Sequence, residues 1–468
     1  MATSESNPPE SQEMEVVEGL QSRAAFSLPR EILAGLTVSF VAISLGAAFG
    51  VQSERGALAG ILSAGVIGLV TAIIGGTRIQ CSGPTAPMTA VMLVMVSAVS
   101  GGLLADEGLS DVPPAQFFNL TLVLTGVIML VAAALRLGRF IQVVPRSVIS
   151  GFMNGIAVLI WLGEIKTLFG LGGKTVLEGG VLANLLVALA TVLICFALPP
   201  ILKSIDKRLA SFLPATLVAI VLMTGITRML GLGIERIPLG GALSSFEDFR
   251  SLVATNIPML WSTSLVLLAL PFAIQLAMLA YLDTLLTTLV IDKKASLLLG
   301  KKEETNQDQE LAAQGIGNAV VSLIGGIPGA QATIRSVLIL NEGARSRLAG
   351  ILVGIFVLVE MVLFQSWIAL IPKAVFSGIL LKVGYDVFDW QPLRIYVDEV
   401  RTGMRAPLGE EGKPPLVSHL DMFFILGTTL VTVLVNLNVA VVAFTVIYYA
   451  VHWGRSFASK QEQTSVSG

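Results

Sequence analysis

Two ionisable side chains, Asp283 and Arg335, lie inside strongly apolar stretches of the sequence. An ionised group at the centre of a membrane helix costs about 2.5–3.5 kcal/mol on insertion scales, so such residues are normally functional. Asp283 stands in the run AMLAYLDTLLTTLV, with Thr287 one helical turn later on the same face. This carboxylate and hydroxyl predict a site for a small cation or a proton.

Arg335 follows the glycine- and proline-rich sequence GGIPGAQAT and lies in the first turn of a short apolar run. In that position its guanidinium adds a full positive charge and fork-like donors to the positive end of a helix dipole. The pattern predicts an anion site. A structural ion pair between Asp283 and Arg335 is the alternative interpretation, and the two are compatible.

A second interrupted segment precedes the short apolar run MTAVMLVMVSAVS, where the chain reads IQCSGPTAP over 79–87. A half-helix that begins inside a membrane presents free backbone N–H groups. Two such N-termini facing each other predict an anion site near the membrane midplane. Ordinary proline kinks are the alternative, which the symmetric placement of the two segments disfavours.

The remaining polar residues offer less chemistry. Cys81 and Cys195 lie in apolar surroundings and are interpreted as small core residues. The sequence has no cluster of metal ligands, no P-loop and no nucleophile elbow, so neither an enzyme nor an ATP-driven pump is expected. Three ionisable residues at segment ends or helix contacts are weaker candidates: Glu164, Glu360 and Lys382. His419 and His452 lie at segment ends beside loops, so neither is expected to be a metal ligand or a proton relay.

The composition predicts a polytopic membrane protein. Of 468 residues, 54% are hydrophobic and 13% are charged, and the mean hydropathy is +0.82. Soluble domains carry roughly 25% charged residues, so a soluble fold is excluded. No basic cluster with interleaved aromatic residues appears, and nucleic acid binding is not expected.

Apolar runs of membrane-spanning length predict an all-α fold with about 14 transmembrane segments. The two interrupted runs are the third and the tenth, which predicts two inverted repeats of seven segments, over 30–232 and 233–455. A disordered tail is expected over 1–29 and a second tail over 456–468. The runs lie near 31–53, 58–76, 85–100, 117–138, 145–168, 180–200, 212–232, 263–292, 311–325, 332–343, 348–370, 373–389, 419–436 and 437–453.

The distribution of basic residues predicts the orientation. When Lys and Arg are assigned to alternate loops, 21 fall on the side of the N-terminus and seven on the other side. The positive-inside rule then places both termini in the cytoplasm of a multi-pass protein of the plasma (inner) membrane.

Several motifs in combination resemble the SulP family of inorganic anion transporters, over about residues 30–455. The wording of three of them, over 144–155, 282–287 and 315–318, is most similar to that of bicarbonate-transporting members. The motifs are AGLT (34–37), AFG (48–50), GPTAPMT (83–89), VPRSVISGFMNG (144–155), LDTLLT (282–287), GIGN (315–318), GAR (343–345) and LAG (348–350).

The resemblance implies fourteen segments in two inverted repeats, a core domain that moves against a gate domain, and usually a homodimer. It also implies an anion held between the two half-helix N-termini. In sodium-coupled members, the positions of Asp283, Thr287, Gln331, Ala332 and Thr333 hold the ion. The anion pocket would be lined by Leu45, Phe49, Thr85, Ala86, Thr333, Ile334 and Arg335.

Two departures from the family pattern matter. The position of Arg335 is small in the sodium-dependent bicarbonate transporter and is arginine in exchangers and in the plant sulfate symporters, where proton coupling is implied. Members usually carry a C-terminal STAS domain, whereas only about fifteen residues follow the last segment here, so none is expected.

We therefore expect a secondary active transporter of a small inorganic oxyanion, bicarbonate or sulfate, that works by elevator-type alternating access. The coupling ion would be sodium or a proton, and no other cofactor is expected. The expected partners are the anion, the lipid bilayer and a second copy of the chain. An uncoupled anion exchanger or chloride-type channel is the alternative within transport, and a membrane-embedded enzyme or scaffold is the alternative of another class.

Overall fold

The computed structural model describes residues 27–139, 145–171, 176–205, 214–237, 246–300, 302–402, 417–435 and 439–451. These residues are mostly helical and include one short two-stranded sheet. The tail predicted over 456–468, and nearly all of that over 1–29, lies outside the described residues.

Each of the fourteen apolar runs predicted from the sequence forms a helix, which confirms the all-α membrane fold. Seven of these helices are long and apolar enough to cross a membrane. The helices are α2 (Leu28–Gln52), α3 (Ala57–Ile74), α4 (Ala86–Ser100), α6 (Pro114–Ala134), α7 (Arg146–Phe169), α8 (Gly180–Ile205), α10 (Ala215–Met229), α12 (Thr263–Leu299), α13 (Gln307–Ser322), α14 (Thr333–Asn341), α15 (Arg347–Ile368), α16 (Lys373–Val387), α18 (His419–Leu434) and Val439–Val451.

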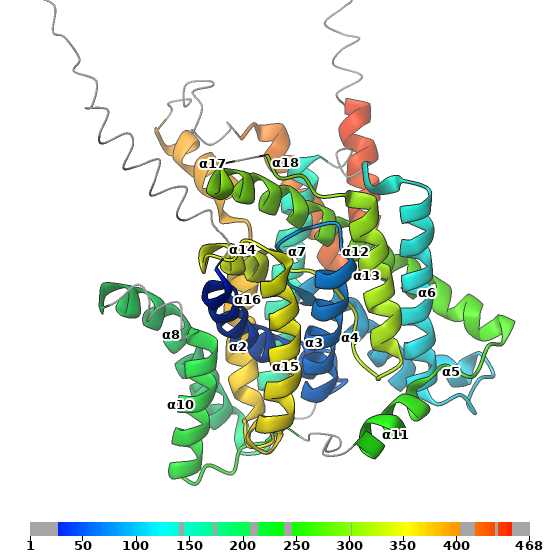
Figure 1. Cartoon of the computed structure of the whole chain (residues 1–468), viewed down its shortest axis with the longest axis vertical. Helices are drawn as coiled ribbons and strands as arrows, with labels where there is room; N and C mark the ends of the chain where they lie inside the picture. The colour runs from blue at the N-terminus through cyan, green and yellow to red at the C-terminus, as the bar shows by residue number, and fades with distance from the viewer. Residues whose placement is uncertain are drawn as a thin grey trace, which may run out of the picture. The chain divides into compact units, whose positions relative to one another are not determined.

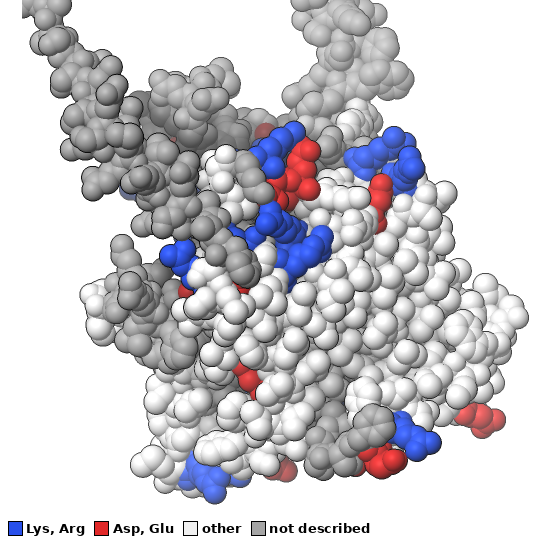
Figure 2. All heavy atoms as spheres, viewed as in Figure 1, with Lys and Arg blue, Asp and Glu red and all other residues white. Residues whose placement is uncertain are grey.

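Three further helices connect these segments: α5 (Leu103–Asp106), α11 (Phe246–Asn256) and α17 (Trp390–Thr402). The charged side chains avoid a broad part of the surface. Figure 2 shows, on the face in view, a wide area of uncharged residues with Lys, Arg, Asp and Glu gathered mainly above and below it. An uncharged surface of this kind is what a lipid bilayer requires.

The chain forms two compact units, each built from separate stretches of sequence. Unit 1 contains α2 to α6 and α11 to α15. Unit 2 contains α7, most of α8 and α10, α16 to α18 and the helix Val439–Val451. Each unit therefore takes helices from both of the predicted repeats.

In unit 1, α3 lies side by side with α2, α13 and α15, and α6 packs against α12 and α13 (Figure 1). Small residues allow the closest of these contacts. A Cβ atom added at Gly60 would lie 1.9 Å from the carbonyl oxygen of Gly46. The backbones of α2 and α3 touch at this point, as is common where membrane helices pack through small residues.

In unit 2, α7 packs against α16 and α18. Gly151 and Gly155 of α7 face α18, where an added Cβ would meet Ile425 and Thr432 within 2.4 Å. The indole of Trp161 donates a hydrogen bond of 3.0 Å to the carbonyl of Leu381 in α16.

The strands β1 (Ser82–Pro84) and β2 (Gly329–Gln331) pair antiparallel inside unit 1. Ser82 lies opposite Gln331, and Pro84 lies opposite Gly329. One residue separates each strand from the following half-helix, α4 or α14. Because the strands run in opposite directions, the two half-helices begin at opposite ends of the strand pair.

The contact between α2 and α3 makes a prediction about stability. Replacement of Gly60 by Ala forces the two helices apart, and we expect a loss of about 1–3 kcal/mol in unfolding free energy. Gly163→Ala is the matched control, because this helical glycine of α7 has open space around it. It is expected to raise stability by roughly 0.5–1 kcal/mol. Equal melting temperatures of the two variants in detergent would contradict the packing described here.

Candidate functional site

The half-helices α4 and α14 begin next to the strand pair and present backbone donors there. The first turn of any helix has N–H groups without an intrahelical acceptor. Neither Thr85 nor Ala332, the residues that precede α4 and α14, caps its helix with a side chain. The positive ends of two helix dipoles therefore flank the strands.

Arg335 extends from the first turn of α14 along the strand pair. Its side chain is buried, with 1% exposed. One guanidinium nitrogen, Nη2, donates a 3.0 Å hydrogen bond to the carbonyl oxygen of Pro84 at the end of β1. The other, Nη1, has no hydrogen-bond partner among the described residues. A full positive charge with a free donor thus lies beside both helix N-termini.

Gly83 of β1 makes room for this guanidinium. Its φ angle is +148°, in the region that favours glycine, and an added Cβ would lie 3.0 Å from Nη1 of Arg335. Across the pair, a Cβ at Gly329 would lie 2.4 Å from the carbonyl oxygen of Gly83. The two strands can approach each other this closely, with the arginine packed against them, because Gly83 and Gly329 have no side chain.

Oxygen atoms from α12 and β2 gather on the neighbouring side of the strand pair. The hydroxyl groups of Thr287 and Thr333 are 2.5 Å apart. The Thr287 hydroxyl donates to the backbone carbonyl oxygen of Gln331 at 3.3 Å. The backbone N–H of Gln331 donates to the hydroxyl of Thr284 at the same distance. Asp283, the neighbour of Thr284 in α12, lies near the Thr85 hydroxyl and the Arg335 charge, but no hydrogen bond joins it to Thr85.

Four buried polar atoms in this region have no hydrogen-bond partner within the described residues. They include an acceptor, the Asp283 carboxylate, as well as N–H donors, and Asp283 and Arg335 form no salt bridge. An unpaired buried polar group costs about 1–3 kcal/mol, so a cluster of them requires an explanation such as a bound ligand. The atoms are Thr85 Oγ1, Asp283 Oδ2, Gln331 Nε2 and Arg335 Nη1.

The sequence-predicted residues outside this cluster differ in how far their side chains are buried. Leu45 and Phe49 are on α2, which packs against β1, α4 and α14. Phe49 and Ala86 are buried, each with 4% exposed, and Leu45 is partly buried. Ile334 is 52% exposed in the chain, so it does not pack into the interior as its neighbour Arg335 does.

The profile of the sulfate permease family matches residues 28–397 of the chain. This match includes both strands, both half-helices and the oxygen-rich part of α12. The chain belongs to the sulfate permease family.

Curated members of the family resemble the chain over most of its length. The bicarbonate transporter BicA of Picosynechococcus sp. is 32% identical over 427 residues, which cover 88% of this chain and 68% of the relative. BicA of Synechocystis sp. is 33% identical over 381 residues, covering 78% and 62%. The putative sulfate transporter YbaR of Bacillus subtilis is 25% identical over 369 residues, covering 79% and 68%. The chain spans about two thirds of the length of these relatives.

Two solved transporter structures share the fold. The transmembrane domain of a cyanobacterial BicA superposes with a TM-score of 0.70 at 29% identity, covering 88% of this chain and 97% of that domain. Murine solute carrier 26 family member A9 superposes with a TM-score of 0.69 at 16% identity, covering 97% and 73%. The chain therefore has the inverted-repeat fold predicted for it.

A polar stripe on α13 of this sulfate permease homologue was not predicted to belong to the site. Glu310, Gln314 and Asn318 are fully buried and stand four residues apart, on one face of the helix. The Gln314 amide donates to Glu310 at 2.9 Å and to the Ser82 hydroxyl of β1 at 2.7 Å. The Asn318 amide both accepts from and donates to the backbone of Gly329, each at 2.9 Å. One face of α13 therefore forms hydrogen bonds to both strands.

The four-residue spacing of polar residues next to and inside an apolar run is the signal that could have identified this stripe. Only two of its members fall within the predicted segment 311–325, so the stripe crosses the boundary between that apolar run and the polar residues before it. Its role as a strand support depends on Ser82 and Gly329, which are distant in sequence.

Arg55, in the loop between α2 and α3, supports the chain ahead of β2. Its guanidinium donates to the carbonyl oxygen of Gly325 at 3.2 Å and lies 5.1 Å from the ring centre of Phe118. Burial lowers the pKa of Arg55 to about 10, so it stays positively charged at neutral pH.

The weaker candidates lie elsewhere. Lys382 pairs with Asp386 within α16, and Tyr396 hydrogen-bonds the ring of His419 at 2.9 Å. Glu164 is buried in α7, whereas His452 is outside the described residues. In the part of the chain that the structure describes, no three His, Cys, Asp or Glu side chains form a metal-binding group. Cys81 and Cys195 are buried free thiols, as expected.

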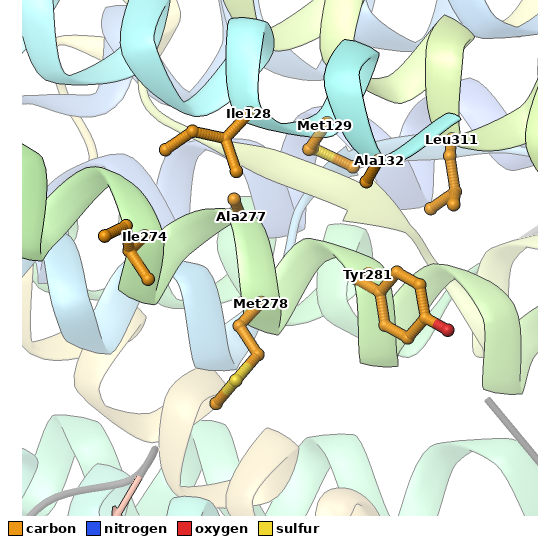
Figure 3. Close-up of a pocket in the computed structure, with 8 residues that line it drawn as sticks. All are labelled: Ile128, Met129, Ala132, Ile274, Ala277, Met278, Tyr281 and Leu311. Atoms are coloured by element: carbon orange, nitrogen blue, oxygen red, sulfur yellow. The ribbon is translucent and has the colours of Figure 1, made fainter. Parts of the chain in front are cut away.

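A hollow of about 160 Å³ lies between α6, α12 and α13 (Figure 3), and none of the residues with unpartnered polar atoms described above lines it. Its walls are apolar apart from one tyrosine, so it offers an anion no donors of the kind found beside the strands. It is lined by Ile128, Met129, Ala132, Ile274, Ala277, Met278, Tyr281 and Leu311.

The contact between Gly83 and Arg335 makes a second prediction. Gly83→Ala combines backbone strain of about 1–2 kcal/mol with a collision against the guanidinium, so it should lower the melting temperature markedly. Gly108→Ala, at a glycine with φ of +68° and open surroundings, carries the strain without the collision. In an Arg335→Ala background the cost of Gly83→Ala should fall. Strictly additive effects in this double-mutant cycle would show that the two residues do not interact.

Proposed function

We propose that this chain is a secondary active transporter that moves a small inorganic oxyanion, bicarbonate or sulfate, across the membrane together with a coupling ion. The observation that carries the proposal is the cluster of unpartnered buried atoms at the starts of α4 and α14. It combines N–H donors suited to an anion with a carboxylate suited to a cation. BicA and YbaR, the similar proteins described above, are named as bicarbonate and sulfate transporters.

The anion would bind between the first turns of the two half-helices. Free backbone N–H groups, the Thr85 hydroxyl and Nη1 of Arg335 are donors that oxyanions accept from. A bidentate or charge-assisted contact to Arg335 would supply most of the electrostatic attraction. Leu45, Phe49, Ala86, Thr333 and Ile334 would complete the pocket, as the family resemblance implies.

Asp283 would carry the coupling ion. An ionised carboxylate beside the bound anion repels it, so a proton or a cation on Asp283 has to remove that charge. The carbonyl of Gln331 and the hydroxyls of Thr287 and Thr333 are oxygen ligands of the kind that sodium accepts, with Ala332 beside them. The Arg335 charge near Asp283 opposes a second cation and favours a proton.

The whole cluster lies within unit 1, which suits an elevator-type movement in which one unit carries the bound anion. With Asp283 neutralised, the Arg335 charge and a monovalent anion cancel. The carrier would therefore cross apolar surroundings with little net charge. We place both termini in the cytoplasm and expect a homodimer in the plasma membrane.

An uncoupled exchanger or chloride-type channel is the second candidate. In such a protein Asp283 serves only as a partner that neutralises Arg335. The absence of a salt bridge between these two described residues disfavours this reading, since both keep an unpartnered atom.

Arg335→Ala tests the anion site. Loss of a charge-assisted hydrogen bond of about 1.5–3 kcal/mol should weaken anion affinity roughly 10- to 100-fold. Arg55→Ala is the matched control, because Arg55 also donates from a largely buried position to a backbone carbonyl but lies outside the cluster. Labelled bicarbonate and sulfate uptake into proteoliposomes provides the measurement. Wild-type affinity in Arg335→Ala would refute the assignment of the anion site.

Asp283→Asn tests coupling. The neutral amide removes the ion-binding charge, so uptake should lose its dependence on the sodium or proton gradient while counterflow exchange of the anion persists. Asp292→Asn, at a carboxylate on the same helix that accepts hydrogen bonds from Thr305, should leave the gradient dependence intact. Applying the sodium and proton gradients separately identifies the ion. Gradient dependence that persists in Asp283→Asn would refute Asp283 as the coupling site, and wild-type uptake that depends on neither gradient would support the exchanger instead.

A further inference from the structure

Glu360 is a second acidic residue inside unit 1, on α15 and remote from the ends of that helix. Its side chain is buried, with 5% exposed, and it faces α2. The oxygen Oε1 lies 2.6 Å from the hydroxyl of Ser39. The other oxygen, Oε2, is buried and has no hydrogen-bond partner among the residues described.

The geometry around Ser39 indicates which group carries the hydrogens. The Ser39 hydroxyl has one hydrogen, yet its oxygen lies within bonding distance of both the Leu36 carbonyl, at 2.8 Å, and Glu360. A carbonyl can only accept a hydrogen bond. If Glu360 carries a proton, it donates to Ser39, and Ser39 donates to Leu36. If Glu360 is ionised, the single hydrogen serves one contact and Oε2 has no donor.

The helices around Glu360 supply no compensating charge. The sequence of α3 has no ionisable residue, and the charges of α2 and α15 in their first turns are those of Arg30, Glu31 and Arg347. Arg347 is thirteen residues from Glu360, or about 20 Å along the helix axis. Glu31 accepts hydrogen bonds from the backbone N–H groups of Arg345 and Ala349, so it is engaged at the far end of the interface.

Helix α15, which carries Glu360, packs closely against α2 and α3 through apolar contacts. An added Cβ at Gly35 of α2 would lie 2.7 Å from Leu352 of α15, and one at Gly65 of α3 would lie 2.6 Å from Leu358. A bare carboxylate in such an interface costs several kcal/mol unless it is paired. The neutral acid is therefore the form that this packing accepts.

We propose that Glu360 is a proton-binding site of this protein, separate from Asp283, and that it carries its proton in the conformation described here. Its role in transport rests on the proposed function. Helix α2 connects Glu360 with the proposed anion site. It contacts Glu360 through Ser39 and also packs against α14, which carries Arg335 in its first turn. Loss of the proton places an uncompensated charge between α2 and α15, which disables the unit that holds the anion site.

Infrared spectroscopy tests the proton directly, without reference to transport. The carboxylic-acid C=O band of Glu360 should be present in wild type and absent in Glu360→Gln. Ser39→Ala should shift that band to higher frequency, because the acid loses its hydrogen-bond partner. Asp283→Asn should leave it in place. If Glu360→Gln instead removes a carboxylate band and no acid band at neutral pH, the proposal is overturned.

Uptake at different pH values tests the consequence. Glutamine mimics the neutral acid, so Glu360→Gln should match wild type at mildly acidic pH and exceed it at alkaline pH. The ratio of the two rates should rise by up to about tenfold per pH unit once Glu360 ionises in wild type. Taking the ratio cancels any change in the charge of the substrate. A ratio that stays constant over the range would refute the role in transport, and uptake by neither protein would refute the proposed function instead.

Discussion

The structure of unit 1 depends on one close contact, the antiparallel pairing of β1 and β2 with the Arg335 guanidinium packed against the two strands. Gly83 and Gly329 permit it, because a side chain at either position would occupy the space of the arginine or of the facing carbonyl. The pairing sets where α4 and α14 begin, and so where their free N–H groups point. A buried arginine next to two dipole N-termini is electrostatically unfavourable by itself. The anion that we propose to bind there would make the arrangement stable.

The supports of this pairing are polar, although they lie deep in an apolar fold. Asn318 satisfies the backbone N–H and C=O of Gly329 in β2, and Gln314 donates to the Ser82 hydroxyl of β1. Non-helical backbone at membrane depth is tolerated only where the protein itself supplies such partners. The stripe on α13 therefore allows the non-helical strands to remain inside the membrane. The N–H groups at the starts of α4 and α14 can then stay free for a ligand.

Two acidic residues of unit 1 occupy contrasting surroundings. Asp283 lies among hydroxyl and carbonyl oxygens and interacts with the Arg335 charge. Binding of a proton or cation to Asp283 would therefore respond to an anion bound beside Arg335. Glu360 has one hydroxyl neighbour and close apolar packing. We propose that the first environment holds the coupling ion beside the anion site, whereas the second accepts only a proton. Helix α2 contacts both regions, which gives the unit a physical connection between them.

The sequence by itself determined the helices and the chemistry, because apolar runs, interrupting Gly and Pro, and isolated charges are local signals. It predicted the fourteen segments, most of them within a few residues, and the two half-helices. It also singled out Asp283 and Arg335, which the structure brings into one cluster. It did not predict the strand pair, the hydrogen bonds of Asn318 to Gly329, or the contact of Ser39 with Glu360. Each of these joins residues that are far apart in the chain, Ser39 and Glu360 by more than 300 positions. Whether a buried polar atom finds a partner is decided by such distant neighbours, so only the tertiary structure distinguished the paired groups from those left free for a ligand.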